Sequence, residues 1–414
     1  MPDTVTADST LDTTLSTGLR LVGERIDSSQ GVAISLRIPA GLKDDPPNKF
    51  GLANLVKETL FKGTQRRNAR ALSDAFDFLG IRRHEYTATE STVLQLRFLT
   101  EHLEKALELL REVLCEPAFP EKECQTARVQ AMQELKHLDD DPFSKVFVLL
   151  KELYFGANWG HYEYGTESSV PELSRSDMDA FWRAQYIPSG SVAAVAGNYD
   201  PAIVQKQLEK LLPAGGPAWP VEDAPSVPSQ PLRQHVFKDS EQTQMALAFP
   251  AVPKNHPNYY VARAAASVLG EGMSSRLFTE VREKRALVYT VGSQAVSLRG
   301  AGAMYVYAGT TAPRAAETLK VIKDELARLG QDITQQEIDR AKVGVKAHML
   351  MDQESTYSRA RELVDDVFFE GRIVPLPEVV ARIDKVTAEE VKAYWAGHPF
   401  EPYAMVTLGK QALE

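Results

Sequence analysis

The feature that most limits the fold of this chain is the similarity between its two halves. The segment FPEKECQTARVQAMQE in the first half aligns with ITQQEIDRAKVGVKAH in the second, and SDMDAFW (176–182) aligns with EEVKAYW (389–395). VAAVAG (192–197) then aligns with AMVTLG (404–409), and the offset changes by only two residues across the three pairs. Three similar segments in the same order indicate an internal duplication of a unit of about 200 residues.

A proline-rich segment divides the 414-residue chain nearly in half. Residues 213–231 contain six prolines. Proline fixes φ and removes a backbone donor, so this density is typical of an extended tether. We therefore expect an N-terminal domain over residues 1–212, a linker over 213–231 and a C-terminal domain over 232–414.

Each half mixes the periodicities of strands and helices. In the first half we predict strands at 18–26, 31–41 and 91–99 and helices at 50–63, 69–79, 102–114 and 121–137. In the second half we predict strands at 244–251, 288–297 and 302–309 and helices at 257–269, 275–286, 313–328 and 334–350. The pattern predicts an α+β fold of two homologous α/β sandwich units, each a mixed or antiparallel sheet covered by helices.

Composition excludes several classes of function. The net charge is −9 with scattered Lys and Arg, which argues against nucleic acid as a partner. No apolar run approaches the roughly 18 residues of a membrane span. The amino end is polar and is not a signal peptide as given, which leaves a cytoplasmic or periplasmic location. The two cysteines, Cys115 and Cys124, lack metal-ligand spacing and are expected to be free thiols.

The segment GLANLVKETLFKGT (51–64) carries an unusual polar group. Asn54, Lys57 and Glu58 stand at i, i+3 and i+4 and share one face of a helix. On such a face, two histidines at i and i+4 can bind zinc while a glutamate at i+3 acts as general base. The segment resembles the zinc helix of the insulinase (pitrilysin) metallopeptidases, in which H-x-x-E-H lies within a very similar frame. Asn54, Lys57 and Glu58 replace its first His, its Glu and its second His.

The resemblance implies a third ligand position at Glu134, 76 residues after Glu58. We call Asn54, Lys57, Glu58 and Glu134 the degenerate zinc site. The Lys57 ammonium repels a divalent cation, so we expect an ion pair of Lys57 with Glu134 or Glu58 and no metal in this chain. The rival hypothesis is an independent zinc peptidase with rearranged ligands from Glu58, Glu134 and His84.

The second half contains GMSSRLFTEVREKRALVYTVGS (272–293). This segment resembles the second signature of the same family, in which an Arg and a Tyr seven residues later face the scissile peptide. The matching residues are Arg282 and Tyr289. A phenol hydroxyl can donate to a carbonyl oxygen that becomes an oxyanion, and a guanidinium can orient the peptide and stabilise charge.

The resemblance covers nearly the whole chain and implies a function. Some bacterial members are heterodimers in which one subunit carries the zinc motif and the other carries the Arg/Tyr pair. We therefore expect an accessory, zinc-free subunit of a zinc metalloendopeptidase acting on unfolded peptides. This chain would not be catalytic alone, and its partner would be an H-x-x-E-H subunit of similar length that binds the zinc. The alternative is a non-catalytic scaffold or a peptide-binding core-type protein.

One departure concerns the edge strand that precedes Tyr86 and Thr87. The family more often has Asn-Ala where this chain has His84 and Glu85. In active members this strand can pair with the substrate backbone. The substitution leaves open whether that pairing persists here.

Overall fold

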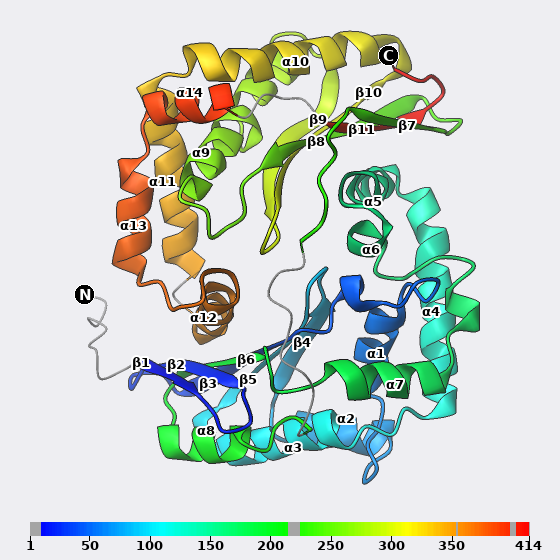
Figure 1. Cartoon of the computed structure of the whole chain (residues 1–414), viewed down its shortest axis with the longest axis vertical. Coiled ribbons are helices and arrows are strands. Elements are labelled where there is room, and N and C mark those ends of the chain that lie inside the picture. Colours follow the sequence, from blue (N-terminus) through cyan, green and yellow to red (C-terminus); the bar gives the residue numbers. More distant parts are fainter. Residues whose placement is uncertain (1–9, 214–223, 353–354, 398–402, 414) are drawn as a thin grey trace. The chain divides into compact units, whose positions relative to one another are not determined.

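The computed structural model describes residues 10–213, 224–352, 355–397 and 403–413 (Figure 1). The chain forms two compact units. Unit 1 comprises residues 1–136, 162–221 and 351–373, and unit 2 comprises 137–161, 222–350 and 374–414. Each unit therefore takes one helical segment from the other half of the sequence. Most of the predicted linker, residues 214–223, lies outside the described residues.

The sheet of unit 1 has six strands in the order β1-β2-β6-β3-β5-β4. Their bounds are β1 (Thr10–Thr14), β2 (Arg20–Arg25), β3 (Gly31–Ile38), β4 (Arg82–Thr87), β5 (Thr92–Leu99) and β6 (Val192–Gly197). The β2–β6 pair is parallel and the other pairs are antiparallel.

The sheet of unit 2 has five strands in the order β7-β11-β8-β10-β9. Their bounds are β7 (Leu232–Phe237), β8 (Gln242–Ala251), β9 (Val288–Ser297), β10 (Gly302–Thr311) and β11 (Ala404–Gly409). The β7–β11 pair is parallel and the rest are antiparallel. This order repeats that of β2, β6, β3, β5 and β4, which confirms the predicted duplication and the α+β fold of two mixed sheets.

Helices cover one face of each sheet. The helices of unit 1 are α1 (Leu52–Leu60), α2 (Ala69–Phe78), α3 (Leu103–Cys115), α4 (Glu121–Asp140), α7 (Arg175–Gln185), α8 (Pro201–Leu208) and α12 (Thr356–Glu370). Those of unit 2 are α5 (Pro142–Phe155), α6 (Ala157–Gly160), α9 (Tyr259–Gly270), α10 (Ala315–Asp332), α11 (Gln335–Asp352), α13 (Leu376–Lys385) and α14 (Ala388–Gly397). In unit 1 the core lies between the sheet and α1, α2, α3 and α7, and in unit 2 between the sheet and α9, α10 and α14.

The opposite face of each sheet packs against the helix contributed by the other half of the chain. In unit 1, Ala360 and Leu363 of α12 pack against small strand residues such as Ala33 and Ala194. In unit 2, Leu150 of α5 belongs to a cluster with alanines of β8, β10 and β11. Small side chains on the strands allow the helix to approach closely. The sequence patterns did not predict this exchange.

The helix that precedes the last strand of each repeat begins with the same kind of cap. In α7, Ser174 and Asp177 form a reciprocal capping box, and the Asp177 carboxylate also pairs with Lys49. Thr387 and Glu390 make the same pair of hydrogen bonds at the start of α14.

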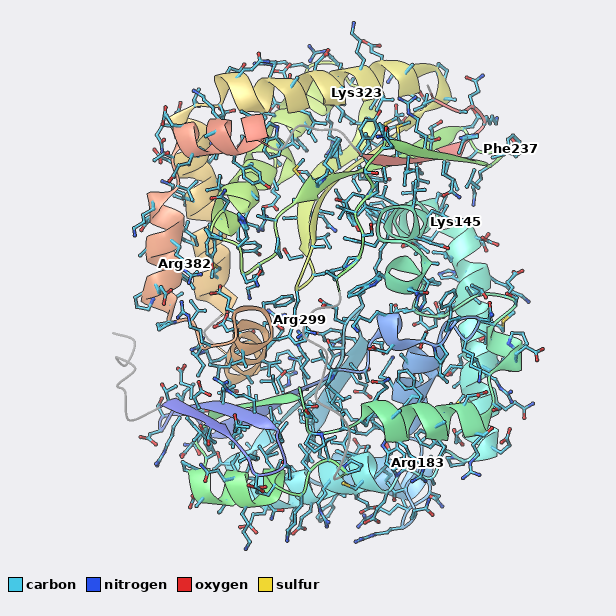
Figure 2. All side chains as sticks on the ribbon, in the orientation of Figure 1. Lys145, Arg183, Phe237, Arg299, Lys323 and Arg382 are labelled. Atoms are coloured by element: carbon cyan, nitrogen blue, oxygen red, sulfur yellow. The ribbon has the colours of Figure 1, made fainter. Side chains whose placement is uncertain are left out.

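Within the described ranges, no helix combines the length and apolar character needed to cross a membrane. Phe237 at the β7 edge is 71% exposed (Figure 2).

Candidate functional site

Helix α1, which carries the degenerate zinc site, is held firmly at its start. Gly51 caps it with a left-handed φ of 95°, a conformation that suits glycine. The Asp45 carboxylate accepts hydrogen bonds of 2.7 Å from the backbone N–H groups of Gly51 and Ala53. Every residue of α1 except Glu58 is buried. The helix therefore keeps its polar face under neighbouring elements.

The polar face of α1 contains a buried amide and a buried ion pair. Asn54 is 1% exposed, and neither polar atom of its amide has a hydrogen-bond partner among the described residues. Lys57 is 7% exposed and forms an ion pair with Glu58. The sequence left Glu134 and Glu58 open as partners of Lys57, and the structure has Glu58.

The surroundings of this face carry further acidic and phenolic groups. Burial raises the pKa of Glu85 on β4, while the charges of Arg83 and Lys57 act in the opposite direction. Burial also raises the pKa of Tyr164 to about 12, and the nearby acidic groups Glu163, Glu134 and Glu58 add to the effect. The predicted site residues Glu58 and Glu134 therefore both lie within electrostatic range of the Tyr164 hydroxyl.

These groups do not fit a zinc ion. A structural or catalytic zinc site takes three or four His, Cys or carboxylate ligands. Across the part of the chain that the structure describes, no group of three or more His, Cys, Asp or Glu side chains is placed to hold a metal. At α1 the cation already present is the Lys57 ammonium, paired with Glu58. His84 is exposed and has Tyr86 as its ring neighbour, with 5.7 Å between the centroids.

Arg282 lies in a π-helix, Phe278–Glu283, where the sequence predicted an ordinary helix over 275–286. Short π-helical turns are rare and occur often at functional sites. The Arg282 guanidinium is exposed and lies 4.8 Å from the centroid of the Phe278 ring. Of the two acids in this turn, Glu280 and Glu283, Glu280 is engaged elsewhere: its pKa is lowered by hydrogen bonds from Lys284 and Arg285. Arg282 makes no ion pair with any described residue.

The turn between Arg282 and Tyr289 is fixed by specific contacts. Ala286 adopts a left-handed φ of 49°, which is uncommon for a residue with a side chain. Arg314 donates to the Ala286 carbonyl at 2.6 Å, and Thr310 donates to the Leu287 carbonyl at 2.5 Å. The turn is therefore held in one conformation despite its strained residue.

Tyr289 lies at a β-bulge on the edge strand β9. Val288 pairs with Thr310 and Thr290 pairs with Gly309, so Tyr289 has no residue opposite it. Bulges re-aim side chains and are frequent beside active sites. The Tyr289 side chain is 67% exposed, whereas Val288 before it is buried. Arg282 is likewise an exposed residue that directly follows a buried valine, Val281.

The structure brings the two predicted residues onto neighbouring elements, because the π-helix contacts β9. Both side chains are exposed, each is anchored by a buried valine, and the backbone at each is irregular. A phenol donor and a guanidinium so placed can stabilise negative charge on a bound peptide.

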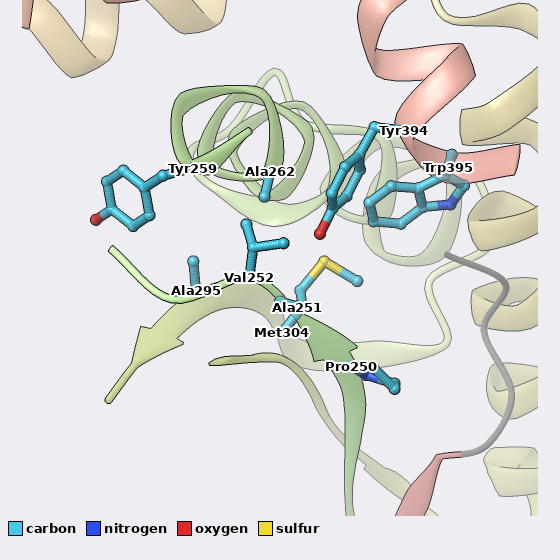
Figure 3. A pocket seen from close by; sticks show the side chains of 9 residues that line it. All are labelled: Pro250, Ala251, Val252, Tyr259, Ala262, Ala295, Met304, Tyr394 and Trp395. Atoms are coloured by element: carbon cyan, nitrogen blue, oxygen red, sulfur yellow. The ribbon is translucent and has the colours of Figure 1, made fainter. Parts of the chain in front are cut away.

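One small pocket of unit 2 is a packing void. It lies between the strands of the sheet and α9 and α14, and Val252, Ala262, Met304 and Trp395 are among its lining residues (Figure 3). Its volume is about 10 Å³, room for no more than one water molecule. The Tyr259 hydroxyl points away from it (Figure 3).

Sequence reasoning missed a second pocket, beside β9. It is lined by four aromatic rings, Phe143 and Phe147 of α5 and Tyr305 and Tyr307 of β10. Phe143 and Phe147 are four residues apart on a helix, and Tyr305 and Tyr307 are two apart on a strand, so the two rings of each pair share a face of their element. These spacings do not indicate that the helix packs on the sheet, so they could not predict the pocket.

Comparison with protein families identifies both halves of the chain. Residues 20–159 match the family described as Insulinase (Peptidase family M16). Residues 172–344 match the Peptidase M16 inactive domain. The chain belongs to the M16, or insulinase, family of peptidases, and its second part is of the inactive-domain type.

Relatives of similar length are named as zinc proteases. An uncharacterized zinc protease of Bacillus subtilis is 28% identical over 95% of this chain and 97% of its own length. An uncharacterized zinc protease of Streptomyces coelicolor is 29% identical over 92% of this chain and 85% of its own.

Solved structures share the fold over the whole chain. A peptidase M16 inactive domain from Pseudomonas fluorescens has a TM-score of 0.90 and 24% identity, covering 98% of this chain and 99% of that one. A protease from Helicobacter pylori has a TM-score of 0.89 and 21% identity, covering 97% and 99%. A chain of complex III from Candida albicans has a TM-score of 0.82 and 19% identity, covering 97% and 96%.

Proposed function

We propose that this chain is the zinc-free accessory subunit of a heterodimeric M16 metalloendopeptidase that degrades or processes unfolded peptides. It supplies Arg282 and Tyr289 to the active centre of a partner of similar length. That partner carries an intact H-x-x-E-H motif and the zinc ion.

The observation that carries the proposal is the contrast between the two sites. At the degenerate zinc site, Lys57 is buried and paired with Glu58, so the donors are unsuited to a divalent cation. At the second site, Arg282 and Tyr289 are exposed on an irregular but well-anchored backbone. Arg282 and Tyr289 can stabilise charge on a peptide, whereas the described residues form no group of side chains that could hold a metal to activate water.

The two residues have distinct roles in this proposal. The Tyr289 hydroxyl donates a hydrogen bond to the carbonyl oxygen of the scissile bond as negative charge develops there. The Arg282 guanidinium, which makes no ion pair with a described residue, binds substrate carbonyl or carboxylate oxygens and orients the peptide. The names of the relatives, which are zinc proteases, support the reaction class.

The test is reconstitution. The purified chain should contain no stoichiometric zinc and hydrolyse no peptide, and activity should appear on mixing with a zinc-motif chain from the same cell. If activity appears but Tyr289→Phe leaves it unchanged, the catalytic role of Tyr289 is wrong. Stoichiometric zinc in the purified chain would instead favour an independent peptidase. Co-purification with a membrane complex and no activity on mixing would favour the scaffold alternative.

A further inference from the structure

We infer that the aromatic pocket beside β9 binds an aromatic side chain of the peptide substrate. We call the pocket lined by Phe143, Phe147, Tyr305, Tyr307 and the strand segment 290–294 the β9 pocket. The inference rests on the proposed function, because it assumes that the chain binds a peptide substrate. It adds that peptides with an aromatic side chain bind more tightly.

The β9 pocket is lined in part by the strand segment that follows Tyr289, the proposed catalytic residue. The segment 290–294 follows directly after Tyr289 on β9, the edge strand of the sheet in unit 2. A peptide that pairs with the edge strand β9 beside Tyr289 would run along the segment that lines this pocket. Successive side chains of an extended peptide alternate in direction, so one in two can enter a pocket beside it.

The rings form a preorganised wall. Phe143 meets Tyr307 edge to face at a centroid distance of 4.6 Å, and Phe147 stacks on Tyr307 at 5.5 Å. Tyr307 is held in place by a 2.6 Å hydrogen bond from its hydroxyl to Gln244. A further ring entering such a cluster gains edge-to-face contacts with rings that are already ordered.

Gly292 contributes no side chain to the lining of the pocket. It pairs with Tyr307 across β9 and β10, and residues paired across strands share a face of the sheet. A glycine there leaves the Tyr307 ring without a covering side chain from β9.

The size and chemistry of the pocket select an aromatic group. Its volume is about 170 Å³, and a cavity of about 150 Å³ accommodates benzene. None of the described residues that line it is charged, which disfavours Lys, Arg, Asp and Glu side chains. Tyr305 is 5% exposed, and its hydroxyl has no hydrogen-bond partner among the described residues. Such orphan hydroxyls are rare in folded proteins, and a bound peptide would bring polar atoms to the region.

The inference is tested by binding to the full-length chain alone, without a zinc partner. Two labelled, unstructured peptides that differ only in a central Phe or Ala are titrated and followed by fluorescence anisotropy. We expect the Phe peptide to bind about tenfold more tightly. Phe143→Ala removes a half-exposed ring from the wall of the pocket, and Gln294→Trp fills the pocket from an exposed strand position. Each variant should reduce the preference for the Phe peptide over the Ala peptide to less than about twofold.

The matched control is Phe237→Ala, which removes an exposed Phe from β7 at the other edge of the same sheet. It should keep the preference. Absence of preference in the wild type, its survival in either pocket variant, or its loss in Phe237→Ala would each overturn the inference. Tyr289→Phe should retain the preference. A chain that selects Phe but fails reconstitution therefore contradicts the proposed function alone, and the reverse result contradicts the pocket alone.

Discussion

The ammonium of Lys57 is ion-paired with the carboxylate of Glu58, the next residue along α1, and the Lys57 side chain is buried. By the resemblance to the family motif, these two residues match its general base and its second histidine. We therefore propose that an ion pair stands on α1 where the motif has its metal-binding turn. Because a buried charge needs a partner, changing either residue alone is expected to destabilise α1.

Replacing the three residues together should create a zinc site. In the triple variant Asn54→His, Lys57→Glu, Glu58→His, two imidazoles share one helix face and Glu134 supplies a carboxylate. We expect about one zinc per chain after dialysis, measured by elemental analysis, whereas the wild type should contain almost none.

The control adds Glu134→Gln to the triple variant, which removes one of the three protein ligands and should lower zinc affinity. A triple variant that folds but binds no zinc would show that Glu134 or the neighbours of α1 are misplaced for coordination.

Tyr289→Phe should lower kcat of the reconstituted enzyme by about 10²- to 10³-fold, the usual loss for one oxyanion donor. KM should change little, because the ring and its contacts remain. The matched control is Tyr259→Phe on α9, whose hydroxyl points away from the packing void (Figure 3) and makes no hydrogen bond with the described residues. Steady-state kinetics on one quenched peptide compare the two variants, and equal losses in both would contradict the assignment.

Arg282→Ala should raise KM by about 10- to 100-fold, because hydrogen bonds to a charged group are lost from the bound peptide. Arg282→Lys should recover only part of the affinity, since lysine lacks the planar fork of donors. The control is Arg285→Ala, which breaks a partly exposed ion pair with Glu280, five residues earlier in the chain. If KM were unchanged in Arg282→Ala but changed in Arg285→Ala, then Arg285 rather than Arg282 would bind the peptide.

The cap of α7 predicts a pH dependence of stability. Burial opposes ionisation of Asp177, but hydrogen bonds from Lys49 and Ser174 outweigh it and lower the pKa from 3.8 to about 2. A carboxyl whose pKa is lowered by folding stabilises the fold above its unfolded pKa and loses this effect as pH falls through the folded value. Asp177→Asn should therefore cost about 1–2 kcal/mol at pH 7, and the difference from wild type should vanish between pH 4 and pH 2.

Thermal unfolding at several pH values measures this effect. The control is Asp179→Asn on the same helix, which breaks an exposed pair with Arg183 and should cost less than about 1 kcal/mol. A gap between wild type and Asp177→Asn that is constant from pH 7 to pH 2 would contradict the prediction.

The repeated topology and most helices and strands could be predicted because they rest on local periodicity. The strand that carries Tyr289 is one example: residues 288–297 were predicted and observed. The bulge at Tyr289 could not be predicted, because it depends on the register with Gly309 and Thr310 across the sheet. The π-helix around Arg282 was also missed, since a hydrophobic pattern over six residues does not separate its hydrogen bonding from that of an α-helix.

At the degenerate zinc site, sequence reasoning placed Lys57 and Glu58 on one face of a helix correctly. It did not indicate the orphaned amide of Asn54 or the nearby Tyr164, because both depend on which elements pack over α1. The aromatic β9 pocket was missed for the same reason, since its two pairs of rings come from opposite halves of the chain.

The exchange of α5 and α12 between the two repeats limits how the repeats can be separated or recombined. A gene cut within residues 213–231 would encode two polypeptides, each missing the helix that shields one side of its own sheet. Neither fragment would be a self-sufficient module. A half recombined with a half from a relative can therefore fold only when that half supplies a helix that packs on the uncovered face of its sheet.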